Sequence, residues 1–302
     1  MSTTTDSTTT DSTTTHPTTA STGPTGARAD GGGGVRQGGG HAAYPGRLPR
    51  IGGPRPTTGV PFARLAQVEL RKMVDTRAGR WLLITIGVVI AAILTILLFV
   101  EGGAHGYEGY FGATSMPLMI LVPIVGIMAA TAEWSQRTGL TTFAIEPRRA
   151  RVVAAKVVAA LLAAAASFAT ALGLAALVNL VAVQARGADS GWSLGWGLLA
   201  GVALVLVLNL AQGVGFGLSL LNTPAAIVAY LVLPTAWSFV TALVKPMRTA
   251  GEWLDLGSAT TPLLEGAAMH AKDWAQVGTA SALWVVLPLA IGLWRVTRSE
   301  VK

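Results

Sequence analysis

Apolar residues in this chain gather into six long, nearly unbroken segments that short polar stretches separate. A helix needs about 20 apolar residues to cross the hydrocarbon core of a bilayer, and each segment is close to that length or longer. The six predicted spans are residues 81–100, 116–132, 152–183, 196–221, 224–244 and 276–294. The third segment is longer than one crossing requires, so we expect its ends to protrude or the helix to tilt.

Residues 61–80, which precede the first span, show helical periodicity instead of a continuous apolar run. At 100° per residue, one side of this helix collects the apolar side chains Phe62, Leu65, Ala66, Leu70, Met73 and Val74. We therefore predict an amphipathic helix that lies on the inner membrane surface. Glu69 breaks the pattern because it falls on the apolar side. It either pairs with Lys72 three residues later or reaches a partner protein.

The first 60 residues have a different composition. They contain STTT three times at a period of five, then runs of glycine and repeated proline, with almost nothing apolar to bury. Such a segment cannot offset the entropy lost on ordering, so we predict a disordered cytoplasmic tail. The predicted organisation is a tail of residues 1–60 followed by a six-helix transmembrane domain of residues 61–302.

Composition supports an all-α integral membrane protein. The chain has 302 residues, of which 51% are hydrophobic, with a net charge of +7 and a mean hydropathy of +0.54. Nucleic-acid binding is disfavoured, because the Lys and Arg residues flank apolar segments instead of covering a polar face. The chain has no cysteine, which excludes disulfides, thiolate metal sites and cysteine nucleophiles.

The positive charges predict the orientation. Thirteen Lys and Arg residues flank the spans on one side of the membrane, in residues 64–80, 133–156 and 295–302, and four lie in the loops on the other side. By the positive-inside rule, both termini lie in the cytoplasm and the protein is a multi-pass protein of the cell membrane. Five tryptophans fall near span ends, as aromatic belts require: Trp81, Trp134, Trp192, Trp196 and Trp294.

The most charged loop is EWSQRTGLTTFAIEPRRARVVAAK, residues 133–156, in which seven of the 24 residues are charged. Glu133 and Arg137 are four residues apart, which suits a short helix. Residues 138–143 mix Gly, Thr and apolar residues, as an amphipathic connector would. The Glu146–Pro147 step ends that connector, and Pro147 suits the first turn of the next helix. Basic residues follow at the cytoplasmic end of that helix: Arg148, Arg149, Arg151 and Lys156.

This loop resembles the family of type 2 permeases of ATP-binding-cassette (ABC) exporters. The similarity rests on the order of Glu, Arg, Thr, Pro-basic-basic and a later Lys in that loop, on the amphipathic VELRKMVDTRAGRWLL segment, and on six spans. It covers residues 62–302. The usual Gly-Thr pair of the family stands here in reverse order, as Thr138–Gly139.

The resemblance implies a mechanism and a set of partners. In such permeases, the loop between spans two and three forms a coupling helix that docks in a cleft of a separate ATPase subunit, beside the amphipathic helix. Carried onto this chain, it implies that Glu69, Glu133, Arg137 and Thr138 face the ATPase. Pro147, Arg148, Arg149 and Lys156 then anchor the loop at the membrane. It also implies a second permease copy or paralogue, with ATP and magnesium bound by the partner and no cofactor in this chain.

Enzymatic motifs are absent or out of context. None of the five lysines follows a glycine, so no phosphate-binding loop is present and ATP must be hydrolysed elsewhere. GWSLG at residues 191–195 matches the nucleophile-elbow pattern, but no sheet is predicted around it. His105 and Glu108 have a metal-ligand spacing without a third ligand nearby, so we predict a solvated loop and no metal site.

Polar side chains within the spans offer a second candidate site. Polar groups at membrane depth either bond neighbouring helices or line a pathway, and both interpretations stay open here for Asn179, Asn209, Gln212, Ser238 and Thr241. Two small-residue pairs in the fourth span, Gly197 with Gly201 and Gly213 with Gly217, favour close helix packing. No span carries an ionisable residue near its middle, which favours coupling to ATP over coupling to an ion.

The sequence therefore predicts the permease subunit of an ABC transporter, with an exporter of an amphipathic or lipid-like substrate favoured. The alternative is a non-transporting membrane anchor or regulatory subunit, in which the basic loop only tethers a cytoplasmic partner. An intramembrane enzyme is disfavoured, because the spans lack catalytic His and Asp pairs.

Overall fold

The computed structural model describes residues 60–99, 105–187 and 191–298, and within these residues all regular structure is helical. Among the described residues, six helices are long and apolar enough to cross a membrane. The chain is thus an all-α, multi-pass membrane protein, which confirms the predicted fold class. The predicted disorder of the tail concerns residues 1–59, which lie outside the described residues.

The amphipathic segment forms a separate helix before the first span. Helix α1 covers Phe62–Asp75 and helix α2 covers Arg77–Phe99, with Thr76 in an extended conformation between them. The Thr76 amide donates to the Lys72 carbonyl at 3.2 Å and ends α1. Its hydroxyl accepts from the Gly79 amide at 3.2 Å, which is how a threonine begins a helix. Residues 61–80, which were predicted as one helix, therefore contain α1 and the first turn of α2, because α2 starts four residues before the predicted span.

Helices α3 and α5 extend beyond the apolar segments that predicted them. Helix α3 covers Gly106–Ser135 and begins ten residues before the predicted span. Helix α5 covers Arg149–Arg186 and is continuous over 38 residues. At a rise of about 1.5 Å per residue it is roughly 57 Å long, well beyond a hydrocarbon core of about 30 Å. The expectation that the third span protrudes or tilts agrees with this length.

The next two spans match the prediction to within one residue at each end. Helix α6 covers Trp196–Leu220 and helix α7 covers Thr223–Leu243. The turn between them is short because Leu221 takes a left-handed conformation (φ 54°). Asn222 then caps α7, since its side-chain oxygen accepts from the Ala225 amide at 3.0 Å.

The segment between α7 and the last span contains helices that the sequence analysis missed. A short 3-10 turn (Lys245–Met247) leads into α8 (Arg248–Leu254) and α9 (Leu256–Leu264). Helix α9 buries Leu256, Ala259 and Leu263 in an apolar cluster with Val205 of α6. Packing against α6, which is distant in the sequence, stabilises α9. The apolar pattern of a nine-residue segment is too short to identify the helix without that packing.

The sixth span is interrupted. Helix α10 covers Ala271–Ser281, a π-helical turn covers Ala282–Val286, and α11 covers Leu287–Arg298. Within the π-helical turn, the Trp284 indole N–H donates to the Leu254 carbonyl of α8 at 2.7 Å. The irregular turn thus lies where the last span contacts the missed helices.

Helices α3 and α6 form the centre of the packing, and glycines of α6 make their approach close. A Cβ on Gly213 would lie 2.6 Å from the Pro123 carbonyl oxygen of α3, and one on Gly217 would lie 2.8 Å from the Ala130 side chain. Gly201 of the other pair, Gly197 with Gly201, lies against the Leu263 backbone of α9. The predicted packing role of both glycine pairs is therefore confirmed.

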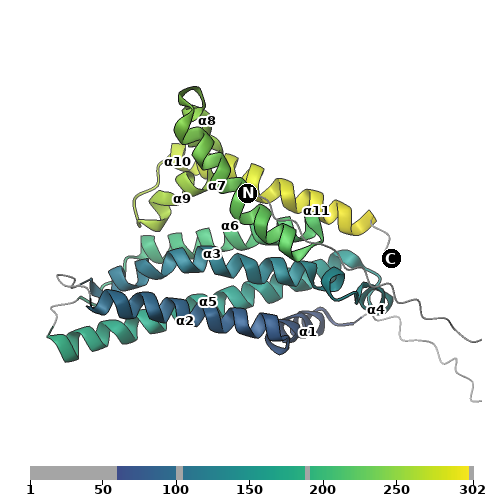
Figure 1. The fold of residues 1–302 in the computed structure, drawn as a ribbon, viewed down its shortest axis with the longest axis horizontal. Coiled ribbons are helices and arrows are strands. Elements are labelled where there is room, and N and C mark those ends of the chain that lie inside the picture. Colours follow the sequence, from purple (N-terminus) through teal and green to yellow (C-terminus); the bar gives the residue numbers. More distant parts are fainter. Residues whose placement is uncertain (1–59, 100–104, 188–190, 299–302) are drawn as a thin grey trace, which may run out of the picture. The chain divides into compact units, whose positions relative to one another are not determined.

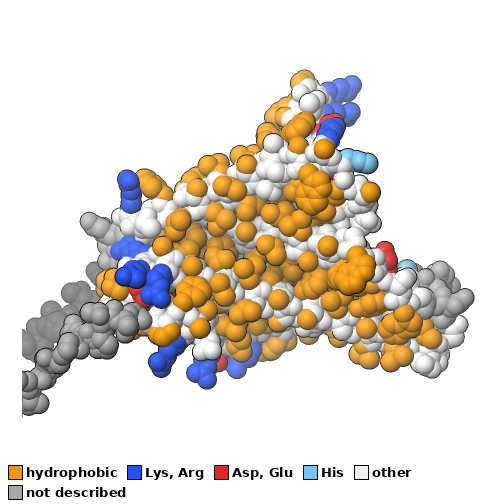
Figure 2. Space-filling view, turned by 180° about the vertical axis from the view of Figure 1, so that it is seen from behind, with side chains coloured by type: hydrophobic (Ala, Val, Ile, Leu, Met, Phe, Trp, Pro, Cys, Tyr) orange, Lys and Arg blue, Asp and Glu red, His pale blue; other side chains and the backbone are white. Residues whose placement is uncertain are grey.

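The outer helices leave a broad apolar surface. In Figure 1, α2, α3 and α5 run side by side, with α1 and α4 (Gly139–Ile145) at one end of them. Figure 2 shows apolar side chains over much of one face, with Lys and Arg side chains gathered near an end. Such a distribution is typical of a protein whose middle is surrounded by lipid.

Candidate functional site

The charged loop of residues 133–156 folds around the short helix α4. The α3 helix ends with a Schellman motif, in which Arg137 takes a left-handed conformation (φ 55°). The Arg137 amide donates to the Trp134 carbonyl at 3.4 Å, and the Thr138 amide donates to the Glu133 carbonyl at 3.0 Å. Glu133 and Arg137 therefore do not share a short helix, which corrects the expectation drawn from their spacing.

The connection from α4 to α5 is fixed by Glu146, which is extended before Pro147 as expected. Its carboxylate accepts from the Arg148 amide at 3.3 Å and pairs with the Arg151 guanidinium at 2.9 Å. Helix α5 begins at Arg149, so Pro147 precedes this helix and does not lie in its first turn. Arg151 also donates to the Val60 carbonyl at 2.9 Å, which ties the start of α1 to this connection.

Arg149 joins α5 to the end of the last span. Its guanidinium donates to the Val296 carbonyl of α11 at 2.7 Å and lies 4.9 Å from the centre of the Phe143 ring of α4. The Phe143 ring in turn lies 6.4 Å from the Trp134 ring of α3. Phe143 thus holds α4 against α3 and α5, and Arg149 in turn joins α5 to α11.

Four charged side chains from three helices meet beneath α1, and we call Glu69, Lys72, Glu133 and Lys156 the ion cluster. The Lys156 ammonium of α5 lies 2.6 Å from Glu69 of α1 and 2.6 Å from Glu133 of α3. Lys72 lies 2.6 Å from Glu69 and 3.4 Å from Glu133. The charges of the two lysines and the two glutamates cancel, and this pairing offsets the free-energy cost of removing charged groups from water.

The electrostatics of α1 follow from this cluster. Burial by itself would raise the pKa of Glu69, but the ammonium groups of Lys156 and Lys72 outweigh it and hold that pKa below its ordinary value. Burial would likewise lower the pKa of Lys72, but Glu69 and Glu133 raise it above its ordinary value. Both groups of α1 are therefore charged over the physiological range.

The cluster changes the roles expected for three residues. The Glu69, Glu133 and Lys156 side chains are only 7%, 1% and 4% exposed. They bond one another inside the protein, so the expectation that both glutamates lie on a partner-facing surface is not met in this structure. The local pairing of Glu69 with Lys72 is confirmed, and Lys156 adds the bond across helices that spacing along one helix did not predict.

Other residues of the loop do lie at the surface. Arg137, Thr138, Pro147 and Arg148 are exposed. Two large apolar side chains of α4 are also exposed, Leu140 at 64% and Ile145 at 70%. Beside them, a cavity of about 340 Å³ lies between α1, α4 and the start of α5, and we call it the α1–α4 groove.

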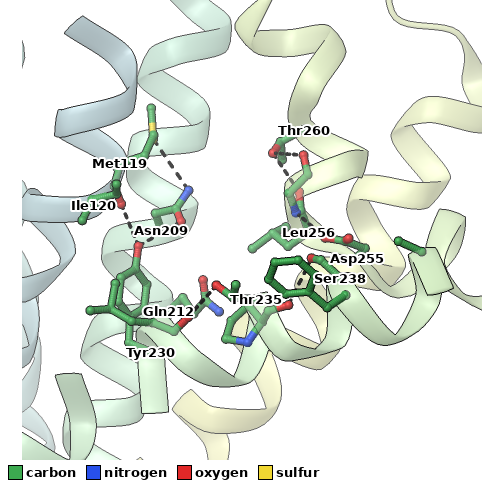
Figure 3. Close-up of a pocket in the computed structure, with 15 residues that line it drawn as sticks. Met119, Ile120, Asn209, Gln212, Tyr230, Thr235, Ser238, Asp255, Leu256 and Thr260 are labelled. Carbon is green, nitrogen blue, oxygen red and sulfur yellow. Dashed lines mark hydrogen bonds between the residues drawn. The ribbon is translucent and has the colours of Figure 1, made fainter. Parts of the chain in front are cut away.

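A second cavity lies among the spans, and we call it the membrane cavity. It has a volume of about 550 Å³. Helices α3, α6, α7 and α9 line it through Met119, Ile120, Asn209, Gln212, Tyr230, Leu231, Pro234, Thr235, Ser238, Phe239, Ala242, Asp255, Leu256, Gly257 and Thr260. Figure 3 shows Asn209 and Tyr230 on one side of the space and Leu256 and Thr260 across from them.

The membrane cavity brings together three of the five polar residues singled out from the sequence. Asn209, Gln212 and Ser238 line it. Thr241 is buried where α7 meets Gly251 of α8, and Asn179 donates to the Gly191 carbonyl at 3.4 Å, beyond the cavity. Neither residue lines the cavity, and the Thr241 hydroxyl donates within its own helix, to the Ser238 carbonyl at 3.1 Å.

Four polar residues of the membrane cavity were missed by the sequence analysis: Tyr230, Thr235, Asp255 and Thr260. The Tyr230 hydroxyl donates to the Met119 carbonyl at 2.7 Å, and Asp255 caps α9 by accepting from the Gly257 amide at 2.9 Å. Asp is one of the residues preferred at the N-cap of a helix, so the residue type at position 255 could have indicated the cap of α9. Nothing in the sequence indicated that the cap lies beside α6 and α7.

The weaker chemical motifs find no supporting geometry. Within the described residues, no group of three His, Asp or Glu side chains could hold a metal ion. Glu108 instead accepts from the Gly195 amide at 3.1 Å. The GWSLG segment forms an irregular stretch before α6, and the described parts of the chain contain no strand from which a nucleophile elbow could be built.

Comparison with known proteins adds no assignment. The chain matches no protein-family model, and no significantly similar sequence was found among curated proteins.

Proposed function

We propose that the chain is the membrane-spanning permease subunit of an ABC transporter, driven by a separate cytoplasmic ATPase. The α1–α4 groove and the exposed side chains around it form the docking surface for that ATPase. One observation carries the proposal: the surface helix α1 is joined to two spanning helices, α3 and α5, through the buried ion cluster.

The ion cluster gives the surface a rigid link to the membrane domain. The Lys156 ammonium is shielded from solvent and must keep both of its carboxylate partners, because separating them would leave charges unpaired in a medium of low polarity. A displacement of α1 therefore moves the ends of α3 and α5 with it. Such rigid-body transmission is what a pump with a separate motor requires.

The surface around the groove suits a protein partner. Leu140 and Ile145 are large apolar side chains on a seven-residue helix, and the described chain leaves 64% and 70% of them exposed. Arg137 and Arg148 are exposed on either side of α4 and add positive charge. Apolar anchors with a charged rim are typical of protein interfaces. We assign this surface to the ATPase and propose that the second permease copy packs against the spans within the membrane.

Docking can be tested by co-purification from membranes. Replacing Ile145 with Glu puts a charge into the apolar contact, and we expect at least about a tenfold loss in the recovery of an ATPase subunit. The matched control is Lys272→Glu, which introduces the same residue at an exposed position near the start of α10. Equal recovery of the ATPase with the Ile145→Glu variant and with the unchanged chain would contradict the docking surface.

The membrane-anchor alternative predicts a different result. An anchor holds its partner without receiving work from it, so ATP turnover by the bound partner should not depend on the ion cluster. Transport instead predicts that Glu133→Gln, which removes a buried charge without exposing a new surface, leaves the ATPase bound and lowers its turnover. Unchanged turnover in that variant would favour the anchor.

A further inference from the structure

We infer that the membrane cavity is a binding site for an amphipathic organic cation that carries hydrogen-bond donors. This inference rests on the proposed transport function only where it takes the bound molecule to be carried across the membrane. The cavity, its chemistry and its affinity can be tested without any ATPase.

The size and shape of the membrane cavity suit a small organic molecule. Its volume of about 550 Å³ lies within the range of about 300–1,000 Å³ that is usual for small-molecule sites. Apolar side chains form one part of its wall, among them Leu231, Phe239 and Leu256. Seven of the fifteen lining residues have polar side chains, and this mixture suits a molecule that has both an apolar body and polar groups.

The hydroxyl groups of the cavity have already used their protons. Thr235 donates to the Leu231 carbonyl at 2.6 Å, and Ser238 donates to the Pro234 carbonyl at 3.1 Å. Thr260 donates to the Leu256 carbonyl at 2.8 Å in the same way. Each oxygen keeps lone pairs that can still accept, but it has no proton left to give. The hydroxyl groups therefore favour a ligand that donates hydrogen bonds.

Asp255 places a negative charge in the wall of the cavity. It is 6% exposed, and no basic group of the described chain lies within ion-pair distance of its carboxylate. The amides of Gly257 and Ser258 and the Ser258 hydroxyl stabilise the charge but do not neutralise it. In the described parts of the chain, Lys, Arg and His are all absent from the cavity wall. A cation is therefore the charged group that this wall attracts.

Gln212 supplies an observation that is independent of Asp255. Its side chain lines the cavity and is only 2% exposed, yet its amide nitrogen has no hydrogen-bond partner within the described residues. Leaving a buried amide without a partner costs about 1–3 kcal/mol, so groups of this kind usually serve a purpose. An acceptor on the ligand would satisfy this amide, while the cationic end lies toward Asp255.

The test uses the full chain in lipid nanodiscs and two xanthene dyes of similar size. Rhodamine 6G is an apolar cation with N–H donors, and fluorescein is its anionic counterpart. We expect the polarisation of rhodamine 6G fluorescence to show saturable binding above that of empty nanodiscs, and fluorescein to show none. Binding of both dyes, or of neither, would overturn the inference.

Two variants identify the site. Asp255→Asn keeps an N-cap side chain for α9 but removes the charge, and it should weaken rhodamine 6G binding about tenfold or more. Gln212→Met keeps the volume and removes the amide, and it should weaken binding by about threefold or more. The matched control is Asp273→Asn, which makes the same change in the cap of α10, outside the cavity, and should leave binding unchanged. An equal affinity of wild type and Asp255→Asn would overturn the inference.

The two proposals can fail separately. Saturable, Asp255-dependent binding by a chain that recruits no ATPase would retain the cation site and remove the transport function. An ATPase that docks and turns over, with rhodamine 6G binding no better than in empty nanodiscs, would retain the transporter and remove the cation site.

Discussion

Lys156 and Glu133 form an ion pair at 2.6 Å although they lie 23 residues apart on different helices. Their side chains are 4% and 1% exposed, so the pair is shielded from water. The same ammonium bonds Glu69 of α1 at 2.6 Å. One lysine thus joins three helices, and its removal leaves two carboxylates with much less compensation.

The first prediction concerns this lysine. Lys156→Met should destabilise the protein by about 3–5 kcal/mol, because it leaves buried carboxylates without their main partner. Thermal unfolding in detergent, followed by the loss of helical circular dichroism, measures the effect. The triple variant Glu69→Gln, Glu133→Gln and Lys156→Met should recover much of the loss. A triple variant as unstable as the single one would show that packing, and not charge, explains the result.

The second prediction concerns pH. The pKa of Glu69 in the folded protein lies below its ordinary value of 4.5, so this group adds stability above pH 4.5 that is lost as the pH falls through the folded value. The pKa of Lys72 lies above 10.5, so its contribution is complete below pH 10.5 and is lost as the pH rises through the folded value. We expect Glu69→Gln to flatten the fall of the melting temperature as the pH is lowered below 4.5. An unchanged slope on the acid side would contradict this role.

The third prediction concerns the packing of α6 on α3. Gly213→Ala places a Cβ 2.6 Å from the Pro123 carbonyl oxygen, so backbone must move, and a loss of about 1–3 kcal/mol in unfolding free energy is expected. Gly173→Ala in α5 is the matched control, since nothing lies within 4 Å of the added carbon. That control should be neutral or stabilising by up to about 1 kcal/mol. Similar losses in both variants would contradict the packing argument.

The fourth prediction concerns the turn before α4. Arg137 has a φ of 55°, which costs a non-glycine residue about 1 kcal/mol. Arg137→Gly should therefore keep or slightly raise the melting temperature, whereas Gln136→Gly, one residue earlier, should lower it. If the exposed Arg137 side chain contacts the ATPase, the glycine variant also lowers ATPase recovery. A lower melting temperature for Arg137→Gly would contradict the Schellman geometry.

The fifth prediction concerns orientation. Because the chain has no cysteine, single cysteines can be labelled without background. In sealed cells, an impermeant maleimide should label Lys272→Cys and should label Thr141→Cys only after the membrane is opened. Both positions are exposed in the structure. Labelling of Thr141→Cys in intact cells would place α4 outside and would remove the proposed coupling to a cytoplasmic ATPase.

The amino-acid sequence determined the membrane domain to a large extent. Continuous apolar segments place α6 and α7 to within one residue, because a helix in lipid must satisfy its backbone internally and cannot end within the hydrocarbon core. The periodicity of residues 61–80 likewise predicted the helix that contains α1, and the Glu146–Pro147 step predicted the end of α4. These features depend on local chemistry alone.

Only the tertiary structure decided which charged and polar side chains meet. Glu69, Glu133 and Lys156 are remote in the sequence, and their burial depends on how α1 packs on α3 and α5. The short helix α9 and the place of Asp255 in the same cavity as Gln212 depend in the same way on contacts with α6. Periodicity reports which face of one helix is apolar, but it carries no information about the helix that will cover that face, and the two candidate sites lie at such contacts.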